Sequence, residues 1–405
     1  MIFSEDALAN SIPVITVNHR GAARLRGGHL WVYRSDLVPP GEAPLGSLVH
    51  VRDERGRHLG SAFYSSASQI AIRLLTGDEI GEAQLTTLLR ERIAAAVRFR
   101  EQVVRDTDSY RAIFSEADLL PGLILDKYND VLTMQALTQA FDRQDLRQTV
   151  LDAIAEHFPE ASVIERVDAH IRELEQLPPR ESQLVRGEQS STIFTLNGLH
   201  FHFDGLGGQK TGAFLDQREN YAAAARYAHG DALDCFAYQG GFALHVARTC
   251  ERVAAVDSSR PALEVAERNE QLNRAAHRCG EIEWIEANAF DLLKDYATAG
   301  RQYDTIVLDP PAFAKTKRAV PTALRGYKEL NLRALKMLRP GGILVTCSCS
   351  FHVSEGEFLA MLGAAAADAG RRVRILEQRG QSLDHPTLLN VPETAYLKCV
   401  ICQVL

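Results

Sequence analysis

Residues 232–242 read Ala-Leu-Asp-Cys-Phe-Ala-Tyr-Gln-Gly-Gly-Phe, which is the pattern of a buried strand, a glycine turn and the start of a helix. Glycines at such a turn let a ligand approach the backbone at the N-terminus of the helix. The spacing differs from the G-x-G-x-x-G fingerprint of dinucleotide-binding folds. The stretch therefore predicts a ligand site at the end of a parallel strand, centred on Gly240, without identifying the ligand.

The regions around this stretch alternate in the same way from residue 198 onward. Short apolar runs alternate with helical patterns at 231–236, 242–249, 252–257, 260–273, 282–286, 304–308, 323–338 and 342–347. This alternation is typical of an α/β fold with a doubly wound parallel sheet. Residues 198–405 are therefore predicted to form one Rossmann-like domain.

Two smaller units are predicted upstream of it. Residues 12–76 contain short strands near 48–52, 59–64 and 70–75, which indicate a small β-barrel. Residues 77–197 combine a helical pattern at 82–106 with a hairpin that turns at Asn129-Asp130, which indicates a central α+β domain.

Composition and length exclude several classes of protein. The chain has 405 residues, of which 46% are hydrophobic and 24% charged, as in globular proteins. No apolar run reaches the roughly 18 residues that a membrane helix needs, and the acidic start at Met1–Asp6 does not resemble a signal peptide. We therefore expect a cytoplasmic protein with no membrane partner.

The seven cysteines do not form a disulfide framework or a metal site in this interpretation. Their number is odd, and all of them lie in the C-terminal half of a long chain. Cys399 and Cys402 have CxxC spacing, but no second such pair or histidine pair follows, so a buried strand is the simpler prediction and no metal is expected.

Charge is distributed unevenly along the chain. The whole chain carries a formal charge of −7, whereas residues 12–76 contain eight arginines, no lysine and four acids, a local balance of 8 − 4 = +4. A small basic module on an acidic protein fits RNA binding, and a solvated surface without a partner fits equally well.

Three polar side chains follow the first three strands of the predicted sheet. They are Asp234, Asp257 and Asn288. Asp257 stands where an acid commonly holds ribose hydroxyls, and Asn288 stands where an adenine edge could be bound. Each alone would more simply cap a helix. Taken in order with Gly240, they resemble class I S-adenosylmethionine-dependent methyltransferases, and the resemblance implies S-adenosylmethionine as cofactor.

A rigid loop follows the fourth strand, with the sequence Asp309-Pro310-Pro311-Ala312-Phe313. The prolines fix the shape of the loop. Asp309 can hydrogen-bond the edge of a base, and Phe313 can either stack on a flipped base or pack in the core. Asp-Pro-Pro alone resembles methyltransferases that act on exocyclic amines, which need no thiol. We therefore predict substrate contacts for Pro310, Pro311 and Phe313, and either a catalytic or a cofactor-side role for Asp309.

Two thiols stand at the end of the fifth strand, in Thr346-Cys347-Ser348-Cys349-Ser350. C5 of a pyrimidine is a poor nucleophile until a thiolate adds to C6 and makes the ring an enamine, which is a form of covalent catalysis. Cys349 lies closer to the strand end and is the preferred nucleophile. Cys347 is expected to be packing, and the alternative that both thiols belong to the core stays open.

Nearly the whole chain resembles the ribosomal RNA large subunit methyltransferase I family, cytosine-C5 methyltransferases of 23S rRNA. The resemblance lies in residues 24–33, 65–70, 116–123, 325–331 and 384–386, and most specifically in Gly208–Arg218. It implies an N-terminal PUA domain that docks RNA, a central domain, a Rossmann-like methyltransferase domain and a homodimer. It also implies that Lys210, Thr211 and Arg218 lie near the methionine part of the cofactor. The Ser-Thr-Cys-Ser pattern of RNA cytosine-C5 methyltransferases, laid on this chain, gives Cys349 as the nucleophile.

The chain departs from the pattern of such enzymes at two positions. Ala312 stands where many have a second cysteine that helps release the product, so the group that removes the C5 proton is not identified. Asn288 stands where an acid is common, although an amide can also read a base edge. Two alternative functions stay open: an RNA N-methyltransferase with structural thiols, and a non-catalytic RNA-binding factor for ribosome assembly.

Overall fold

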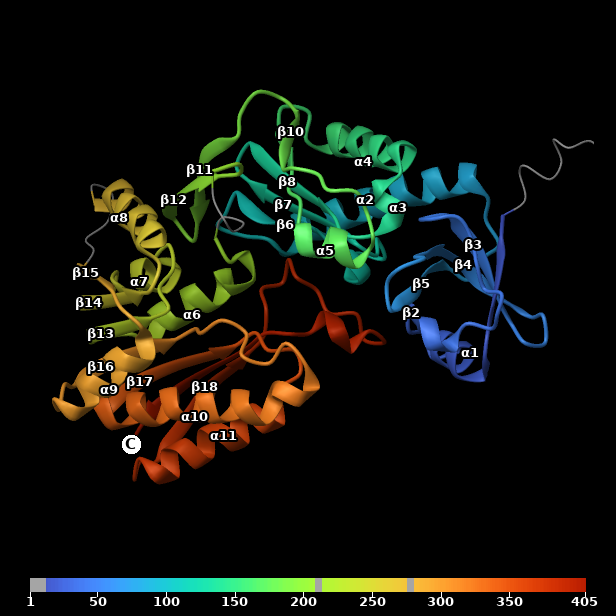
Figure 1. Ribbon diagram of the computed structural model, residues 1–405. Helices are drawn as coiled ribbons and strands as arrows, with labels where there is room; N and C mark the ends of the chain where they lie inside the picture. Colours follow the sequence, from blue (N-terminus) through green and yellow to red (C-terminus); the bar gives the residue numbers. More distant parts are fainter. Residues whose placement is uncertain (1–11, 208–212, 275–279) are drawn as a thin grey trace, which may run out of the picture.

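The computed structural model describes residues 12–207, 213–274 and 280–405. Its parts follow one another in sequence order, from a small N-terminal sheet through a central α+β region to a large α/β sheet (Figure 1). Within the described ranges, every helix is too short or too polar to span a bilayer.

The N-terminal part is a curled sheet with strand order β1-β3-β4-β5-β2. Its strands are β1 (Val14–Val17), β2 (Trp31–Tyr33), β3 (Leu48–Asp53), β4 (His58–Tyr64) and β5 (Ile70–Thr76), and helix α1 (His19–Arg26) packs beside it. Alternate side chains such as Ile15, Val51 and Ile72 are fully buried between the sheet and α1. The strands predicted from 48–75 are confirmed.

The central part has a second sheet, with order β10-β9-β8-β7-β6. Its strands are β6 (Ser109–Phe114), β7 (Leu123–Tyr128), β8 (Val131–Ala136), β9 (Ser162–Glu165) and β10 (Gln183–Arg186); its helices are α2 (Glu82–Val103), α3 (Gln139–Asp142), α4 (Gln144–His157) and α5 (Ala169–Leu174). One apolar cluster joins Phe63 and Leu75 of the N-terminal sheet to Leu89 and Phe141 of this part. The two parts are therefore packed together.

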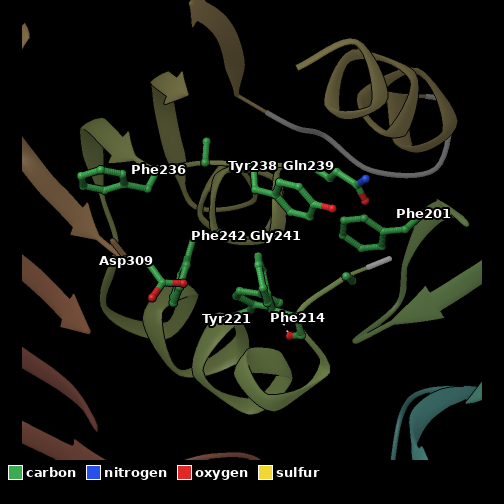
Figure 2. A pocket seen from close by; sticks show the side chains of 11 residues that line it. Phe201, Phe214, Tyr221, Phe236, Tyr238, Gln239, Gly241, Phe242 and Asp309 are labelled. Atoms are coloured by element: carbon green, nitrogen blue, oxygen red, sulfur yellow. Dashed lines mark hydrogen bonds between the residues drawn. The ribbon is translucent and has the colours of Figure 1, made fainter. Parts of the chain in front are cut away.

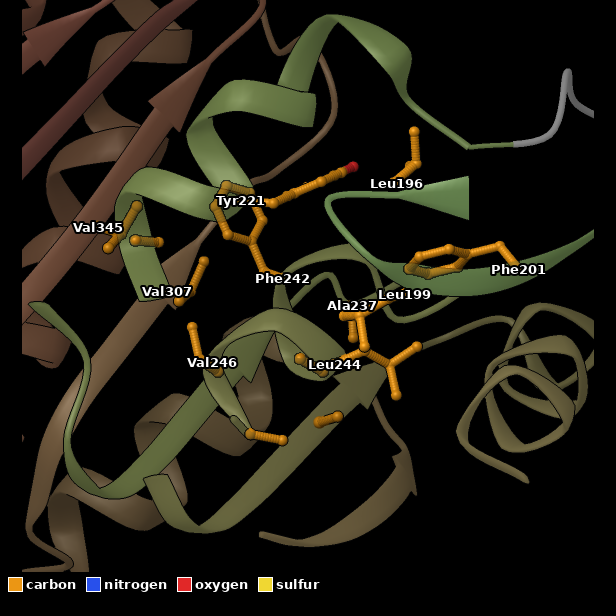
Figure 3. Packing of buried hydrophobic residues seen from close by; sticks show 14 of the residues in the cluster. Leu196, Leu199, Phe201, Tyr221, Ala237, Phe242, Leu244, Val246, Val307 and Val345 are labelled. Carbon is orange, nitrogen blue, oxygen red and sulfur yellow. The ribbon is translucent and has the colours of Figure 1, made fainter. Parts of the chain in front are cut away.

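A hairpin connects the central part to the large sheet. It consists of β11 (Ser191–Leu196) and β12 (Leu199–Asp204), and the predicted domain boundary between residues 197 and 198 falls in its turn. Phe201 and Leu199 of the hairpin belong to the same buried cluster as Leu244 and Val307 of the large sheet region (Figure 3). The three predicted domain boundaries stay predictions.

The large sheet has seven strands in the order β15-β14-β13-β16-β17-β19-β18. The strands are β13 (Gly230–Cys235), β14 (Cys250–Asp257), β15 (Glu281–Glu286), β16 (Tyr303–Leu308), β17 (Leu338–Ser348), β18 (Val373–Arg379) and β19 (Lys398–Val404); the helices are α6 (Arg218–Tyr227), α7 (Gly241–Val246), α8 (Arg260–Arg274), α9 (Ala289–Thr298), α10 (Val320–Met337) and α11 (Glu355–Asp368). The chain reverses its direction of winding between β13 and β16, and such a switch point opens a crevice at the carboxyl ends of the strands.

The sheet is mixed, which differs from the parallel sheet predicted from sequence. Strand β19 lies between β17 and β18 and runs antiparallel to both. Its short apolar run does not reveal direction, because a buried strand has the same pattern in either orientation. This arrangement pairs Cys347 with Cys399 and Ser348 with Lys398 across β17 and β19.

Candidate active site

The turn after β13 has an unusual backbone. Phe236, Tyr238 and Gly240 have φ angles of 70°, 50° and 88°, although the first two carry side chains. Left-handed conformations are costly for such residues and persist where the surrounding structure holds them. Here Asp257 contributes, because its carboxylate accepts a hydrogen bond of 2.9 Å from the backbone N–H of Tyr238. Predicted residue Asp257 therefore shapes the turn that Gly240 completes.

The glycines of this turn stand where a side chain would not fit. A Cβ at Gly240 would lie 2.8 Å from the indole ring of Trp284, and a Cβ at Gly241 would lie 2.5 Å from Cζ of Tyr221. Among the described residues, neither carboxylate oxygen of the buried Asp234 has a hydrogen-bond partner. Buried polar atoms are rarely left without partners, so this backbone cradle and carboxylate fit a bound polar ligand.

A pocket opens in front of this turn (Figure 2). Aromatic side chains form most of its wall, and the lining residues are Phe201, Ala213, Phe214, Tyr221, Phe236, Ala237, Tyr238, Gln239, Gly241, Phe242 and Asp309. Asp309 lies at one end of the pocket and Phe201 with Gln239 at the other. An apolar cleft with a few polar groups suits a nucleoside-type ligand.

The remaining residues predicted to bind the cofactor have mixed placements. Asn288 is exposed and caps α9, accepting a bond of 2.9 Å from the N–H of Phe290. Arg218 is buried in an ion pair of 3.0 Å with Asp384, away from the pocket lining. Lys210 and Thr211 lie outside the described residues.

Asp309 lies at the end of β16, between the pocket and the two thiols. Its Oδ1 accepts a hydrogen bond of 3.0 Å from Nε2 of Gln217. Burial, with the nearby charge of Asp216, raises the pKa of Asp309 to about 7, despite the hydrogen bonds from Gln217 and Cys347. The carboxyl group can therefore both hold and release a proton near neutral pH.

The three predicted substrate contacts in the loop after Asp309 differ in burial. Pro310 is buried, Pro311 is exposed and Phe313 is half-buried. The ring of Phe313 packs on Tyr327, with a centroid separation of 4.6 Å. Both roles considered for Phe313 are compatible with this position, because packing on Tyr327 fixes the ring beside the loop.

The two thiols differ in exposure. Among the described cysteines, Cys349 is the one that is not fully buried. Its Sγ lies 4.0 Å from the carbonyl oxygen of Pro310. Cys347 is fully buried opposite Cys399, and burial, with its coupling to Cys399, raises the pKa of the Cys347 thiol well above its usual value. The structure thus places the half-buried Cys349 against the carbonyl of Pro310 and the buried Cys347 beside Asp309 and Cys399.

Hydrogen bonds fix the end of β17 around Cys349. The hydroxyl of Tyr327 lies 3.0 Å from Ser348 Oγ and 2.9 Å from Ser350 Oγ. Ser350 Oγ also accepts a bond of 3.0 Å from the N–H of Ala314, which ties β17 to the loop after Asp309. The thiol is therefore held between two serines whose side chains are buried and paired.

Comparisons with known proteins agree with this geometry. A family model described as "PUA-like domain" matches residues 15–77, and one described as "S-adenosylmethionine-dependent methyltransferase" matches residues 129–401. A Photobacterium profundum protein named ribosomal RNA large subunit methyltransferase I is 37% identical over 94% of this chain and 96% of its own. A Citrobacter koseri protein of the same name is 34% identical over 98% of this chain and 100% of its own. The chain belongs to the ribosomal RNA large subunit methyltransferase I family.

The fold of this family member is also found among solved structures. A structure of SMU.776 complexed with SAH has a TM-score of 0.82 at 18% identity and covers 97% of this chain and 100% of its own. The predicted PUA-like domain, methyltransferase fold and S-adenosylmethionine dependence are confirmed. The residues that line the pocket at Gly241 and Asp309 all lie inside the matched methyltransferase region.

Two residues of this methyltransferase site were missed by sequence reasoning. Gln217, which holds Asp309, lies in the motif Gly208–Arg218, so the motif could have indicated it. Lys398 reaches the residue after Cys349 by donating a bond of 2.7 Å from Nζ to the carbonyl oxygen of Ser350. A single lysine before an apolar strand carries no such signal, since only the position of β19 in the sheet brings it there.

Proposed function

We propose that this methyltransferase forms 5-methylcytidine in 23S rRNA through covalent addition of the Cys349 thiolate to C6 of the cytosine. The observation that carries the proposal is the position of the Cys349 thiol, half-buried and 4.0 Å from the carbonyl oxygen of Pro310 in the Asp-Pro-Pro loop. The names of the relatives support ribosomal RNA of the large subunit as the substrate class.

On the cofactor side, the roles follow from the turn after β13. Asp234, Gly240 and Asp257 would hold S-adenosylmethionine, with Asn288 near its adenine. Lys210, Thr211 and Arg218 are proposed for its methionine end. When bound, S-adenosylmethionine supplies the methyl group that C5 accepts.

On the substrate side, Asp309 would hold the base. A carboxyl group with a pKa of about 7 can donate a proton toward the ring nitrogen N3 and take it back later. A proton at N3 draws electrons away from C6 and makes that carbon a better target for a thiolate. Pro310, Pro311 and Phe313 would set the plane of the base.

One turnover forms and then breaks a single bond between Cys349 and the base. The thiolate of Cys349 forms a bond to C6, the electron pair of the C5–C6 double bond forms a C4–C5 double bond, and the pair of the C4–N3 double bond goes to the protonated N3. C5 of the resulting enamine is nucleophilic. After methylation at C5, a base removes the C5 proton, the double bond forms again and the C6–S bond breaks. The thiolate leaves unchanged, so each turnover regenerates the free side chain.

The protonation state of the Cys349 thiol supports a second candidate function, methylation of a base nitrogen. Burial, with the charges of Asp309 and Asp216, raises the pKa of the Cys349 thiol to about 11. A protonated thiol does not attack C6, which favours methylation of a base nitrogen held by Asp309 and Pro310. The two functions differ in their product, 5-methylcytidine in one case and an N-methylated base in the other.

The test is mass spectrometry of nucleosides from 23S rRNA treated with purified protein and S-adenosylmethionine. We expect 5-methylcytidine from the parent protein, none from Cys349→Ala and substantial amounts from Cys347→Ala, the matched control on the same strand. Both variants should bind S-adenosylmethionine as the parent does. Full 5-methylcytidine formation by Cys349→Ala would overturn the mechanism, and an N-methylated product would replace the proposed function.

The partners of the enzyme are part of the proposal. The PUA-like domain would dock the rRNA, the cytoplasm would be the site of action and two copies would form a homodimer. Light scattering during gel filtration measures the mass of the particle, and a value near 44.8 kDa, the mass of one chain, would contradict the dimer.

A further inference from the structure

Lys398 stands at the first position of β19, opposite Ser348 of β17. Its Nζ donates two hydrogen bonds, of 2.7 Å to the carbonyl oxygen of Ser350 and 2.9 Å to that of Tyr396. Ser350 directly follows Cys349, so the ammonium group is fastened to the backbone beside the thiol. The antiparallel strand β19 thus brings the Lys398 ammonium group close to the Cys349 thiol, whereas the acids Asp309 and Asp216 approach the thiol from other elements.

Charged and titratable groups from several elements act on the Cys349 thiol. Asp309 follows β16, Asp216 precedes α6 and Tyr327 lies on α10. The two carboxylates disfavour a thiolate at Cys349, and the charge of Lys398 favours it. Among the described groups acting on the Cys349 thiol, Lys398 is the cation.

Lys398 is itself held in an unusual state. Burial lowers the pKa of its ammonium group to about 8, against the opposite effect of Cys349 and of Glu355 and Glu357 on α11. At neutral pH the side chain is therefore charged, and it loses its charge within a range that can be reached in an experiment.

Lys398 also lines an open groove that is separate from the pocket at Gly241 and Asp309. The groove has a volume of about 650 Å³, and Phe351, Val353 and Leu397 line it next to Lys398. A small reagent can reach this end of the sheet, since Cys349 is half-buried and Phe351 is 41% exposed.

We propose that Lys398 stabilises the thiolate of Cys349 by its positive charge, and so acts as a positioning residue through the nucleophile; this inference rests on the proposed function. The thiol proton passes to solvent, Lys398 stays protonated, and the sulfur retains the electron pair that forms the bond to C6. When the C6–S bond breaks at the end of the cycle, the pair returns to sulfur beside the same cation.

The test is the rate at which iodoacetamide alkylates Cys349 between pH 6 and 10, with the site identified by peptide mass spectrometry. Alkylation consumes the thiolate, forms a C–S bond and releases iodide, so it needs neither rRNA nor methylation. Lys398→Gln keeps N–H donors for the two carbonyl oxygens without the charge, and Lys398→Arg keeps both. Cys349→Ser identifies any signal that comes from another cysteine.

We expect Lys398→Gln to react about tenfold more slowly than the parent at pH 7, which equals a shift of about one pH unit in thiol titration. The parent should lose this advantage above about pH 8, where Lys398 becomes neutral, and Lys398→Arg should keep it. Superimposable curves for the parent and Lys398→Gln would overturn the proposal. An equal change in the alkylation rate of Lys398→Gln and Lys398→Arg at all pH values would also overturn the proposal, since the effect would then come from altered structure and not from lost charge.

Two further results keep the inference separate from the proposed function. If Lys398→Gln does not fold, the parent curve decides, because a curve without an inflection near pH 8 contradicts the pairing. If Cys349→Ala still forms 5-methylcytidine, the covalent mechanism fails, whereas the alkylation curves report the charge pairing independently.

Discussion

Asp309 lies between the aromatic pocket and the two thiols of β17 and its C-terminal end. It lines the pocket of Tyr238 and Phe242, accepts a hydrogen bond from Gln217 and acts on the pKa of both thiols. A carboxyl group buried at this point must be neutral part of the time, because burial disfavours its charge. Its raised pKa is therefore a property of the folded protein and affects stability as well as catalysis.

This raised pKa gives a pH-dependent prediction. The pKa of Asp309 is about 7 in the folded protein, whereas an aspartate in the unfolded chain has its ordinary pKa of 3.8. Between about pH 4 and 7 the folded state retains a proton that the unfolded state has lost, so its stability falls as pH rises. Asp309→Asn removes this loss of stability. The thermal midpoint of the variant minus that of the parent should therefore increase from pH 4 to 7 and stay constant above pH 7.

Asp231→Asn is the control for this measurement. The ion pair with Arg252 lowers the pKa of Asp231, so its contribution has the opposite sign. The stability that the Asp231 carboxylate contributes is present above about pH 4 and is lost as pH falls. The thermal midpoint of the parent minus that of Asp231→Asn should therefore increase as pH rises. A midpoint difference for Asp309→Asn that does not change with pH would contradict the raised pKa.

Gly240 belongs to the scale of the element, because it fixes the turn between β13 and α7. Alanine there would adopt a φ of 88° with its Cβ 2.8 Å from the ring of Trp284. We expect Gly240→Ala to lower the free energy of unfolding by about 1–2 kcal/mol. S-adenosylmethionine affinity should fall at least about tenfold, or about 1.4 kcal/mol, in isothermal titration calorimetry.

Gly363→Ala provides the matched control within α11. No described atom lies within 4 Å of a Cβ at this exposed position. Alanine in an open helix interior should raise the free energy of unfolding by about 0.5–1 kcal/mol and leave cofactor affinity unchanged. Equal affinities for Gly240→Ala and the parent would show that the turn does not hold the cofactor.

Elements could be predicted from sequence where the signal was local. The alternation in 48–52 and 59–64 and the turn at Asn129-Asp130 depend on neighbouring residues only, and the structure confirms them. The central position of β19 depends on which strands surround it, and no residue within Lys398–Val404 encodes that. For the same reason Cys349 could be singled out by its motif, whereas its neighbour Lys398 could not.

At the scale of the whole molecule, charge counts proved less informative than charge pairing. Residues 12–76 carry an excess of arginine, but five of these side chains form ion pairs: Arg20, Arg26, Arg52, Arg57 and Arg73. Arg73 pairs with Glu175 of the central part at 3.5 Å. Part of the positive charge that suggested RNA binding therefore serves the internal structure of the protein.

Asp384 joins the central part to the large sheet region. Its Oδ1 accepts a bond of 3.0 Å from Arg218, and its Oδ2 accepts one of 2.9 Å from the N–H of Arg111. Its carbonyl oxygen accepts one of 2.8 Å from Arg100 on α2. We expect Asp384→Asn to lower the free energy of unfolding by about 3–5 kcal/mol, because it breaks a buried ion pair and leaves Glu219, at 3.3 Å, as the remaining carboxylate beside Arg218.

Urea denaturation measures this effect, with Glu267→Gln as the control. Glu267 forms an ion pair of 2.8 Å with Arg260 on the surface of α8, and its loss should cost less than about 1 kcal/mol. Equal effects of the two substitutions would show that the buried pair of Asp384 and Arg218 contributes no more to stability than an exposed pair.

The position of β19 also bears on the moment at which the enzyme becomes active during its own synthesis. β19 follows the other strands of its sheet in sequence, yet it occupies an inner place between β17 and β18. A ribosome that has released β17 and β18 has not yet supplied the strand that joins them. The nascent chain therefore carries Cys349 on an incomplete sheet, and under the proposed pairing the thiol would gain its cation only when synthesis has passed Val404.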